Sequence, residues 1–205
     1  MEVRWLKQEG AEEAIVVFGG WAIGPEVFDH LKGPEDILFV SGYSDLRADL
    51  PDLSSYRRVR LLAWSFGVAS YAHWQQGRAD PFAAKVAVNG SLQPVSRAAG
   101  IAPLTFRKTA ENLSLDSYQQ FLTRAFGVPQ PARMLDVEAR RAELIAVEQR
   151  GDAPRLPFDR VWISEDDRIF PPASLSRAWA GLPVRRIKAP HVPFAHFSAW
   201  EELFQ

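Results

Sequence analysis

The sequence predicts an α/β fold in which helices cover a mainly parallel β-sheet. Short apolar runs alternate along the chain with segments that carry helix signals, and this alternation is typical of layered α/β proteins. Most of the runs are apolar at nearly every position and end at Gly, Ser or Asn. Strands that are buried on both faces, as in a parallel sheet, have this character.

Seven of these runs are interpreted as strands, and they are rich in β-branched or aromatic residues. They lie at residues 2–6, 14–20, 36–42, 59–65, 85–91, 159–165 and 184–190. Three segments between them are predicted helices, because proline favours the first turn of a helix and glycine favours its end. Segment 25–32 begins with Pro25, segment 66–77 ends at Gly77, and segment 172–181 has both signals.

The interval from about residue 91 to residue 159 contains no convincing strand but two stretches that are predicted to be amphipathic helices. One amphipathic helix is expected over 114–127, with Ser114 as its N-cap, and a second over 134–151. The Pro-rich stretch GVPQPAR forms the turn between them. We therefore predict a single domain, 1–205, with a helical cap inserted at about 92–157. The predicted apolar faces comprise Tyr118, Phe121, Leu122 and Phe126, and Leu135, Val137, Leu144, Ile145 and Val147.

The composition is that of an ordinary soluble globular protein of one domain. The chain has 205 residues, 47% hydrophobic and 24% charged, and its net charge is −1. This balance gives no reason to expect nucleic acid or a membrane as a partner. Cysteine is absent, which excludes disulfides, a thiolate nucleophile and cysteine-based metal sites. No signal peptide or membrane span is visible, so we expect a cytoplasmic protein. A monomer is expected as well.

The stretch LLAWSFGVAS, residues 61–70, places Ser65 where a predicted strand meets a predicted helix. A nucleophilic serine on such a tight turn needs small residues two positions before it and two positions after it. These positions hold Ala63, where glycine is usual, and Gly67. The following helix would direct its N-terminal amides toward the serine. The stretch by itself fits a nucleophile or a structural serine equally well.

Partners for a nucleophilic serine follow in the required order along the chain. An orienting acid is expected after a late strand, where Asp166 and Asp167 lie, and a base after the last strand, where His191 and His196 lie. Asp167 and His191 are the preferred pair, and Asp166 and His196 remain alternatives. The two other histidines are expected at the surface of early helices: His30 and His73.

An oxyanion hole would need two backbone amides close to the serine. Phe66 supplies one directly after the nucleophile, and the loop VVFGGWAIG supplies Trp21, after two glycines that let the backbone turn closely. The same loop does not fit the dinucleotide pattern G-x-G-x-x-G, and no P-loop or histidine-rich ligand cluster is present. We therefore expect no cofactor and no metal.

Four stretches together resemble the α/β-hydrolase superfamily and, more closely, its BioG-type pimeloyl-[acyl-carrier protein] methyl ester esterases. They are VVFGGWAIGPEVF, AWSFGVASY, EDDRIFPP and APHVPFAHFSAW, and the resemblance extends over essentially the whole chain. It implies a compact α/β-hydrolase fold with a helical cap. By position, Ser65 matches the nucleophile, Asp167 the acid and His191 the base. Trp21 and Phe66 match the oxyanion-hole amides. Gly19 stands where such proteins often have histidine, which matters little for a hole built from backbone.

The resemblance also implies a reaction and a partner. Hydrolysis through an acyl-enzyme would free the ω-carboxylate of pimeloyl-carrier protein for biotin synthesis. Phe106, Tyr118 and Phe121 of the cap could line a channel for the acyl chain, although each fits ordinary cap packing equally well. An acidic carrier protein would dock on basic residues, for which Arg124, Arg140 and Arg141 are candidates. Residues 97–155 hold nine basic and seven acidic side chains, so a solvated helix face explains them as well.

Two other functions are compatible with the same motifs. An esterase or thioesterase acting on a small free acyl substrate would use the same three residues. A binding protein that keeps the scaffold without catalysis would have these residues misaligned or dispensable. The presence of all three residue types favours an enzyme.

Overall fold

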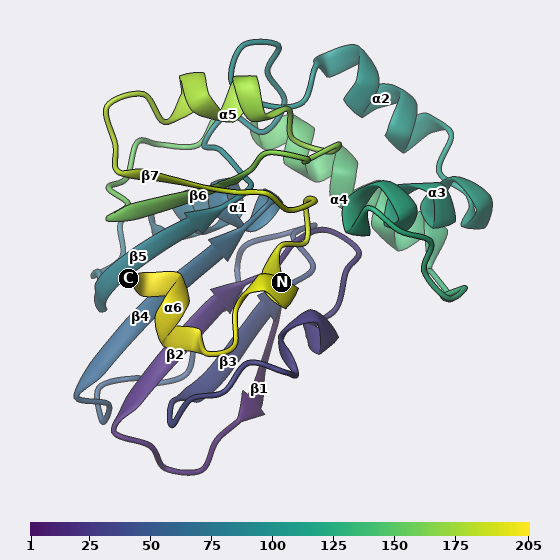
Figure 1. Cartoon of the computed structure of the whole chain (residues 1–205). Coiled ribbons are helices and arrows are strands. Elements are labelled where there is room, and N and C mark those ends of the chain that lie inside the picture. Colours follow the sequence, from purple (N-terminus) through teal and green to yellow (C-terminus); the bar gives the residue numbers. More distant parts are fainter.

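The computed structural model describes residues 1–205 and contains one seven-stranded sheet, in the order β1-β3-β2-β4-β5-β6-β7. Neighbouring strands run parallel, except that β1 is antiparallel to β3 (Figure 1). The predicted mainly parallel sheet is therefore confirmed. The strands are β1 (Glu2–Lys7), β2 (Glu13–Phe18), β3 (Asp36–Ser41), β4 (Arg58–Trp64), β5 (Phe82–Val88), β6 (Arg160–Ser164) and β7 (Val184–Ile187).

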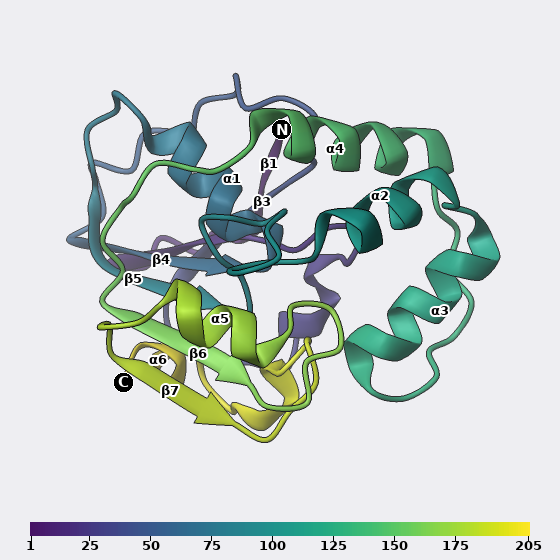
Figure 2. The same ribbon diagram turned by 90° about the horizontal axis from the view of Figure 1, so that it is seen from above.

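The central strands form the core because their apolar runs are covered on both faces. Residues Ala14 to Phe18 of β2 are fully buried. Helix α1 (Phe66–Gln75) packs against β2 and β4 on one face, and α6 (Trp200–Phe204) packs against β5 on the other (Figures 1 and 2). All residues of α1 except His73 are buried, which explains why its sequence shows no polar face. A further helix, α5 (Pro172–Ala178), packs against β6.

Three helices lie beyond the carboxyl ends of the parallel strands and cover that end of the sheet (Figures 1 and 2). They are α2 (Pro103–Glu111), α3 (Leu115–Phe126) and α4 (Val137–Arg150), and all come between β5 and β6. We refer to these three helices as the cap. The predicted N-cap of α3 is confirmed, because the Ser114 side chain accepts from the Ser117 amide in a capping box. None of the helices combines the length and the apolar character that spanning a bilayer requires.

Helix α2 was not predicted as a helix, whereas the predicted apolar face of α4 is confirmed at Leu144 and Val147 and is wrong only at Ile145. Only Phe106 and Ala110 of α2 are buried, so its sequence carries little apolar periodicity. On α4, Ile145 is exposed and Glu143 is buried. Glu143 takes an inward position because its carboxylate accepts from the Tyr43 amide (3.0 Å) and pairs with Arg140 (2.7 Å). These two contacts compensate the cost of burying the Glu143 carboxylate at a position where an apolar residue was expected.

The predicted helix over 25–32 is only a single 3-10 turn, η1 (Pro25–Phe28). The chain cannot continue as a helix because Lys32 pairs with the C-terminal segment. Its amide donates to the Ser198 carbonyl (3.0 Å), and its carbonyl accepts from the Trp200 amide (3.0 Å). A long-range backbone pairing has therefore overridden the local helix signal.

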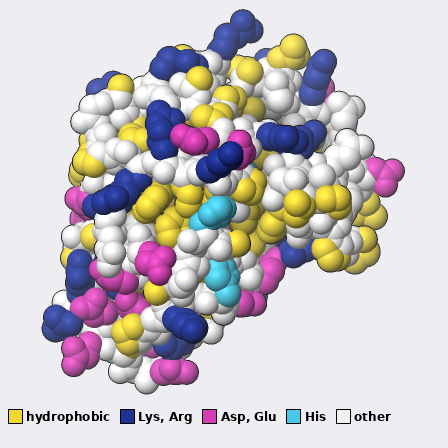
Figure 3. Space-filling model, in the orientation of Figure 1, with side chains coloured by type: hydrophobic (Ala, Val, Ile, Leu, Met, Phe, Trp, Pro, Cys, Tyr) yellow, Lys and Arg dark blue, Asp and Glu magenta, His cyan; other side chains and the backbone are white.

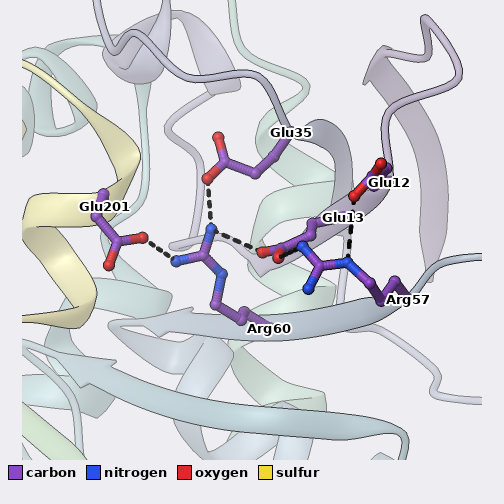
Figure 4. A network of polar contacts seen from close by, with 6 residues as sticks. All are labelled: Glu12, Glu13, Glu35, Arg57, Arg60 and Glu201. Atoms are coloured by element: carbon purple, nitrogen blue, oxygen red, sulfur yellow. Dashed lines mark hydrogen bonds and ion pairs between the residues drawn. The ribbon is translucent and has the colours of Figure 1, made fainter.

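A buried charge cluster lies at the start of β4. The guanidinium of Arg60, 1% exposed, is bonded to Glu35 and, over 2.5 Å, to Glu201 of α6, while a Glu13 oxygen lies 3.7 Å away (Figure 4). The Arg60 guanidinium also lies over the Phe204 ring, 4.6 Å from its centroid. These contacts fasten the C-terminal helix to the centre of the sheet, and we call them the Arg60 cluster.

Candidate active site

Ser65 occupies a sharp turn between β4 and α1. Its backbone has φ 58° and ψ −127°, a conformation that costs about 1–3 kcal/mol and persists only where the surroundings impose it. Two glycines make room for this turn. A Cβ on Gly67 would lie 2.1 Å from the Phe18 carbonyl oxygen, and one on Gly90 would lie 2.2 Å from the Ser65 carbonyl oxygen. The small residue predicted at 67 is thus required by close backbone packing, and Gly90 is a second requirement that the motif does not contain.

Ser65, His191 and Asp167 form one hydrogen-bonded chain across three loops at the carboxyl edge of the sheet. Ser65 Oγ lies 3.0 Å from His191 Nε2, and His191 Nδ1 lies 2.7 Å from Asp167 Oδ2. The carboxylate pairing assigns the ring proton to Nδ1 and leaves Nε2 as an acceptor for the serine hydroxyl. All three side chains are buried. The arrangement has the geometry that nucleophilic attack by a serine requires.

The Asp167 carboxylate is oriented by its own loop. Its Oδ1 accepts from the amides of Ile169 (2.7 Å) and Phe170 (2.9 Å), so that only Oδ2 is left for the histidine. The His191 ring is parallel to the Phe170 ring, with 6.0 Å between the ring centroids, and its centroid lies 5.7 Å from that of the Trp64 ring. These contacts leave the imidazole one orientation.

The backbone of His191 is fixed by residues that sequence reasoning missed. Its carbonyl accepts from Asn89 Nδ2 (2.9 Å) and from Trp64 Nε1 (3.2 Å). Asn89 also bonds both the amide and the hydroxyl of Ser164, at 2.8 and 2.7 Å. One buried side chain therefore joins the end of β5, the strand before Asp167 and the loop of His191. The feature of the sequence that could have indicated Asn89 is its position as a polar residue at the end of the apolar run AKVAVNG.

The alternative partners lie outside this chain of hydrogen bonds. Asp166 and His196 are exposed, and neither side chain forms a hydrogen bond. The two early histidines contact backbone carbonyls elsewhere: His30 that of Phe194 and His73 that of Gly151. The geometry therefore favours Asp167 and His191 over the alternatives.

The predicted oxyanion-hole residues both face the same pocket as Ser65. Trp21 and Phe66 line it, and neither of their backbone amides has an acceptor within the protein. Phe66 is the first residue of α1, so its free amide and the positive end of the helix dipole point toward the serine. Close packing also shapes the loop before Trp21, because a Cβ on Gly20 would lie 3.0 Å from the Trp64 ring.

The pocket beside Ser65 has a volume of about 480 Å³ and lies between the sheet edge and the cap. Eight of its seventeen lining residues are apolar, including Trp21, Phe66, Phe106 and Phe121. Its charged lining residues are all basic: Lys108, Arg124 and Arg168. These three side chains are exposed and form no ion pair, so their charges are available to a ligand. Lysine and arginine also predominate over the upper half of the face shown in Figure 3, whereas acidic side chains gather toward its lower end.

Not all predicted substrate and docking residues reach this pocket. Phe106 and Phe121 line it, but Tyr118 does not, because its ring packs behind Phe121 and its hydroxyl donates to the Ala22 carbonyl (2.6 Å). Among the docking candidates, Arg124 is free at the pocket. Arg140 instead pairs with Glu143, and Arg141 donates to the Leu113 carbonyl (2.8 Å). Lys108 was counted among the basic residues of 97–155 but not singled out, and Arg168 was missed, because position in the chain does not show which basic residues share a face.

A family model described as pimeloyl-ACP methyl esterase BioG matches residues 1–203. The chain belongs to the BioG family. The crystal structure of BioG from Haemophilus influenzae superposes with a TM-score of 0.90 at 30% identity, covering 100% of both chains. An uncharacterized protein of the same organism is 32% identical over 217 residues, covering 100% of this chain and 99% of the relative.

One further solved structure shows the same fold, and one further sequence relative has a name of functional interest. The esterase EaEST from Exiguobacterium antarcticum superposes with a TM-score of 0.69 at 13% identity, covering 92% of this chain and 87% of that one, and shows the shared α/β-hydrolase fold. A malonyl-[acyl-carrier protein] O-methyltransferase from Bacteroides fragilis is 31% identical over 181 residues. The match covers 82% of this chain but 36% of that relative, so the chain spans about a third of it. The predicted fold and the predicted carboxylic ester hydrolase are confirmed by the family match.

Proposed function

We propose that this BioG-family protein hydrolyses the methyl ester of pimeloyl-[acyl-carrier protein] with Ser65 as nucleophile, His191 as general base and Asp167 as orienting acid. The observation that carries the proposal is the continuous hydrogen-bonded chain from Asp167 through His191 to Ser65, which opens on a pocket with two free amides. A serine held only for structure would not need a strained backbone, a buried imidazole and a buried carboxylate in register.

The reaction proceeds in two acyl-transfer steps. His191 Nε2 takes the Ser65 proton as Oγ attacks the ester carbonyl, and Asp167 stabilises the imidazolium that forms. The imidazolium then protonates the methoxide, methanol leaves, and an ester between Ser65 and the acyl chain remains. Water attacks this acyl-enzyme with the same proton transfers and releases the free carboxylate. In both steps the oxyanion accepts from the amides of Trp21 and Phe66.

The pocket fits a substrate that is apolar along its chain and acidic at its far end. Phe106 and Phe121 supply apolar contact for a methylene chain. Lys108, Arg124 and Arg168 give the pocket three unpaired positive charges and no negative one, which suits docking of an acidic carrier protein. The thioester would then remain near the carrier while the methyl ester reaches Ser65.

The Bacteroides relative supports a carrier-bound methyl ester as substrate. Its name describes methyl transfer to a malonyl group on a carrier protein, the kind of reaction that makes such an ester. A homologue of this chain thus forms part of a protein with that name. Removal of the methyl group by this chain would release a carboxylate for biotin synthesis.

The proposal is tested by the hydrolysis of three substrates: pimeloyl-carrier protein methyl ester, the free dimethyl ester of pimelate and a short nitrophenyl ester. We expect the carrier-bound ester to be preferred in kcat/KM by at least about tenfold, the size of effect that electrostatic docking can give. Ser65→Ala should abolish hydrolysis of all three substrates.

Two outcomes would contradict parts of this proposal. Equal kcat/KM for carrier-bound and free methyl esters would favour an esterase of small acyl substrates. Turnover by Ser65→Ala equal to that of the wild type would remove Ser65 from the mechanism altogether.

A further inference from the structure

The loop that carries the Trp21 amide is held by three hydrogen bonds to residues of other segments. The Tyr43 hydroxyl lies 2.9 Å from the Gly19 carbonyl oxygen and 3.0 Å from that of Val40, and shares its one proton between them. The Ala22 carbonyl accepts from the Tyr118 hydroxyl (2.6 Å). The indole Nε1 of Trp21 donates to the Arg140 carbonyl (3.0 Å). Two of these three contacts come from the cap, Tyr118 from α3 and Arg140 from α4.

The loop needs such support because part of it is strained. Ala22 has φ 56°, in the left-handed region that residues other than glycine rarely adopt. Without a contact that fixes its carbonyl, Ala22 would relax toward a negative φ, and the peptides around it would turn with it. Trp21 directly precedes Ala22, so the direction of the Trp21 amide depends on the conformation of this segment.

Tyr118 is well suited to hold the loop. It is 3% exposed, does not line the pocket and stacks on Phe121 with 6.2 Å between the ring centroids. Burial raises the pKa of the Tyr118 hydroxyl, with the nearby charge of Arg140 acting in the opposite direction, so the group remains a neutral donor near pH 7. Phe121 in turn packs edge-on against Trp21 at 5.1 Å.

We propose that Tyr118 is a positioning residue for the oxyanion hole, holding the Trp21 amide in its active direction through the hydrogen bond to the Ala22 carbonyl. This inference rests on the proposed function, in which the Trp21 amide stabilises the oxyanion. Helix α3 then has two roles, because it forms a pocket wall with Phe121 and fixes the catalytic loop with Tyr118.

The test uses Tyr118→Phe, which removes one hydroxyl and keeps the ring. Loss of an oxyanion donor costs about 10²–10³ in rate, so misorientation of one should lower kcat by about tenfold. KM for the nitrophenyl ester should stay within about twofold of the wild-type value, because the ring and the pocket wall are unchanged. A short alkyl boronic acid, whose tetrahedral adduct with Ser65 places an oxygen in the hole, should bind about tenfold more weakly.

Tyr56→Phe is the matched control. It also removes a tyrosine hydrogen bond, to Asp36 at the start of β3 (2.9 Å). Neither residue lines the pocket beside Ser65, so kcat and the affinity for the boronic acid should equal those of the wild type. Tm is measured for both variants, and kcat is expressed per folded molecule, which separates a loss of stability from a loss of positioning.

The outcomes separate this inference from the proposed function. Wild-type kcat and boronic acid affinity in Tyr118→Phe, together with an inactive Ser65→Ala, would overturn the role of Tyr118 alone. A raised KM with unchanged kcat would also overturn it, since Tyr118 would then act on substrate binding. An active Ser65→Ala would instead refute the proposed function on which the inference rests.

Discussion

Strand β4 carries a buried polar cluster at each end, and the two differ in what surrounds them. At its start, Arg60 is buried with Glu35 and bonded to Glu201, and the cluster contributes no residue to the pocket beside Ser65 (Figure 4). Just past its end, Ser65 lines this pocket and is hydrogen-bonded to His191, which is bonded in turn to Asp167. The first cluster joins distant elements, and the second lies beside a pocket, where we propose that it acts on a substrate.

This difference shows that burial of polar groups does not by itself indicate a functional site. Both clusters contain buried groups from distant parts of the chain. The informative feature is unused hydrogen-bonding capacity that faces a cavity, which the amides of Trp21 and Phe66 have. Mutations should therefore separate the two ends of β4 by whether activity or stability is lost.

The largest expected effect is on activity, at the carboxyl end. Ser65→Ala should lower kcat by at least about 10⁴-fold, because covalent catalysis is lost and only binding and the oxyanion hole remain. The Tm should not fall, because the substitution removes only one hydroxyl and leaves the packing around residue 65 unchanged. Ser70→Ala is the control: this buried serine of α1 forms no side-chain hydrogen bond, and its loss should leave kcat unchanged. Comparable losses in the two variants would contradict the role of Ser65.

The choice between the adjacent acids gives the next effect. Asp167→Asn should lower kcat by about 10³–10⁴-fold, because an amide cannot hold the imidazole in the required tautomer. Asp166→Asn, at the neighbouring exposed position, should stay within about twofold of the wild type. Steady-state rates with the nitrophenyl ester measure both variants. A larger loss in Asp166→Asn would reverse the assignment of the acid.

At the other end of β4, stability rather than activity should change. Arg60→Met leaves Glu35 buried without its cation, and breaking a buried ion pair in this way costs about 3–5 kcal/mol in unfolding free energy. Arg57→Met, which breaks an exposed pair with Glu12 and Glu13, should cost at most about 1 kcal/mol. Urea unfolding measures both. The folded fraction of Arg60→Met should keep wild-type kcat, and a selective loss of kcat would place the cluster in the mechanism.

The smallest effect concerns the basic side chains of the pocket. Replacing Lys108, Arg124 and Arg168 together by glutamine should lower kcat/KM for a carrier-bound ester by about tenfold, and added salt should lower the wild-type value toward that of the variant. The free ester should be hydrolysed at the wild-type rate. Arg58→Gln removes an exposed, unpaired arginine at the opposite end of β4 and serves as the control. An equal loss on the free ester would assign the three charges to pocket structure instead of docking.

Much of the fold could be predicted because it is encoded locally. The central strands are short apolar runs, whereas β1 (EVRWLK) and β7 (VRRI) at the two ends of the strand order carry charged residues, and helix α3 carries its own cap at Ser114. Helix α2 could not be predicted from its pattern, since only two of its residues are buried. The single domain with an inserted cap stays a prediction, although α2, α3 and α4 do come between β5 and β6.

The structure brings together the candidate site residues that lie in short motifs after strands, and their catalytic roles stay a proposal. Ser65, Asp167 and His191 each follow a strand in a recognisable order. Asn89 was not predictable, because its bond to the His191 carbonyl spans 102 residues, and no local pattern records it. For Tyr118 the sequence left a channel wall and cap packing open, and the structure shows packing. The contact of its hydroxyl with the Ala22 carbonyl could not be predicted from helical periodicity.

The most direct test of the account is the intact mass of the enzyme after rapid acid quench with pimeloyl-carrier protein methyl ester. The proposed mechanism predicts a covalent adduct of enzyme and carrier, equal to the sum of the two masses minus one methanol, and its absence in Ser65→Ala. The distal ester is attacked, so the thioester to the carrier survives in this adduct. An enzyme that carries a methyl pimeloyl group without the carrier would show attack on the thioester instead and would contradict the proposed reaction.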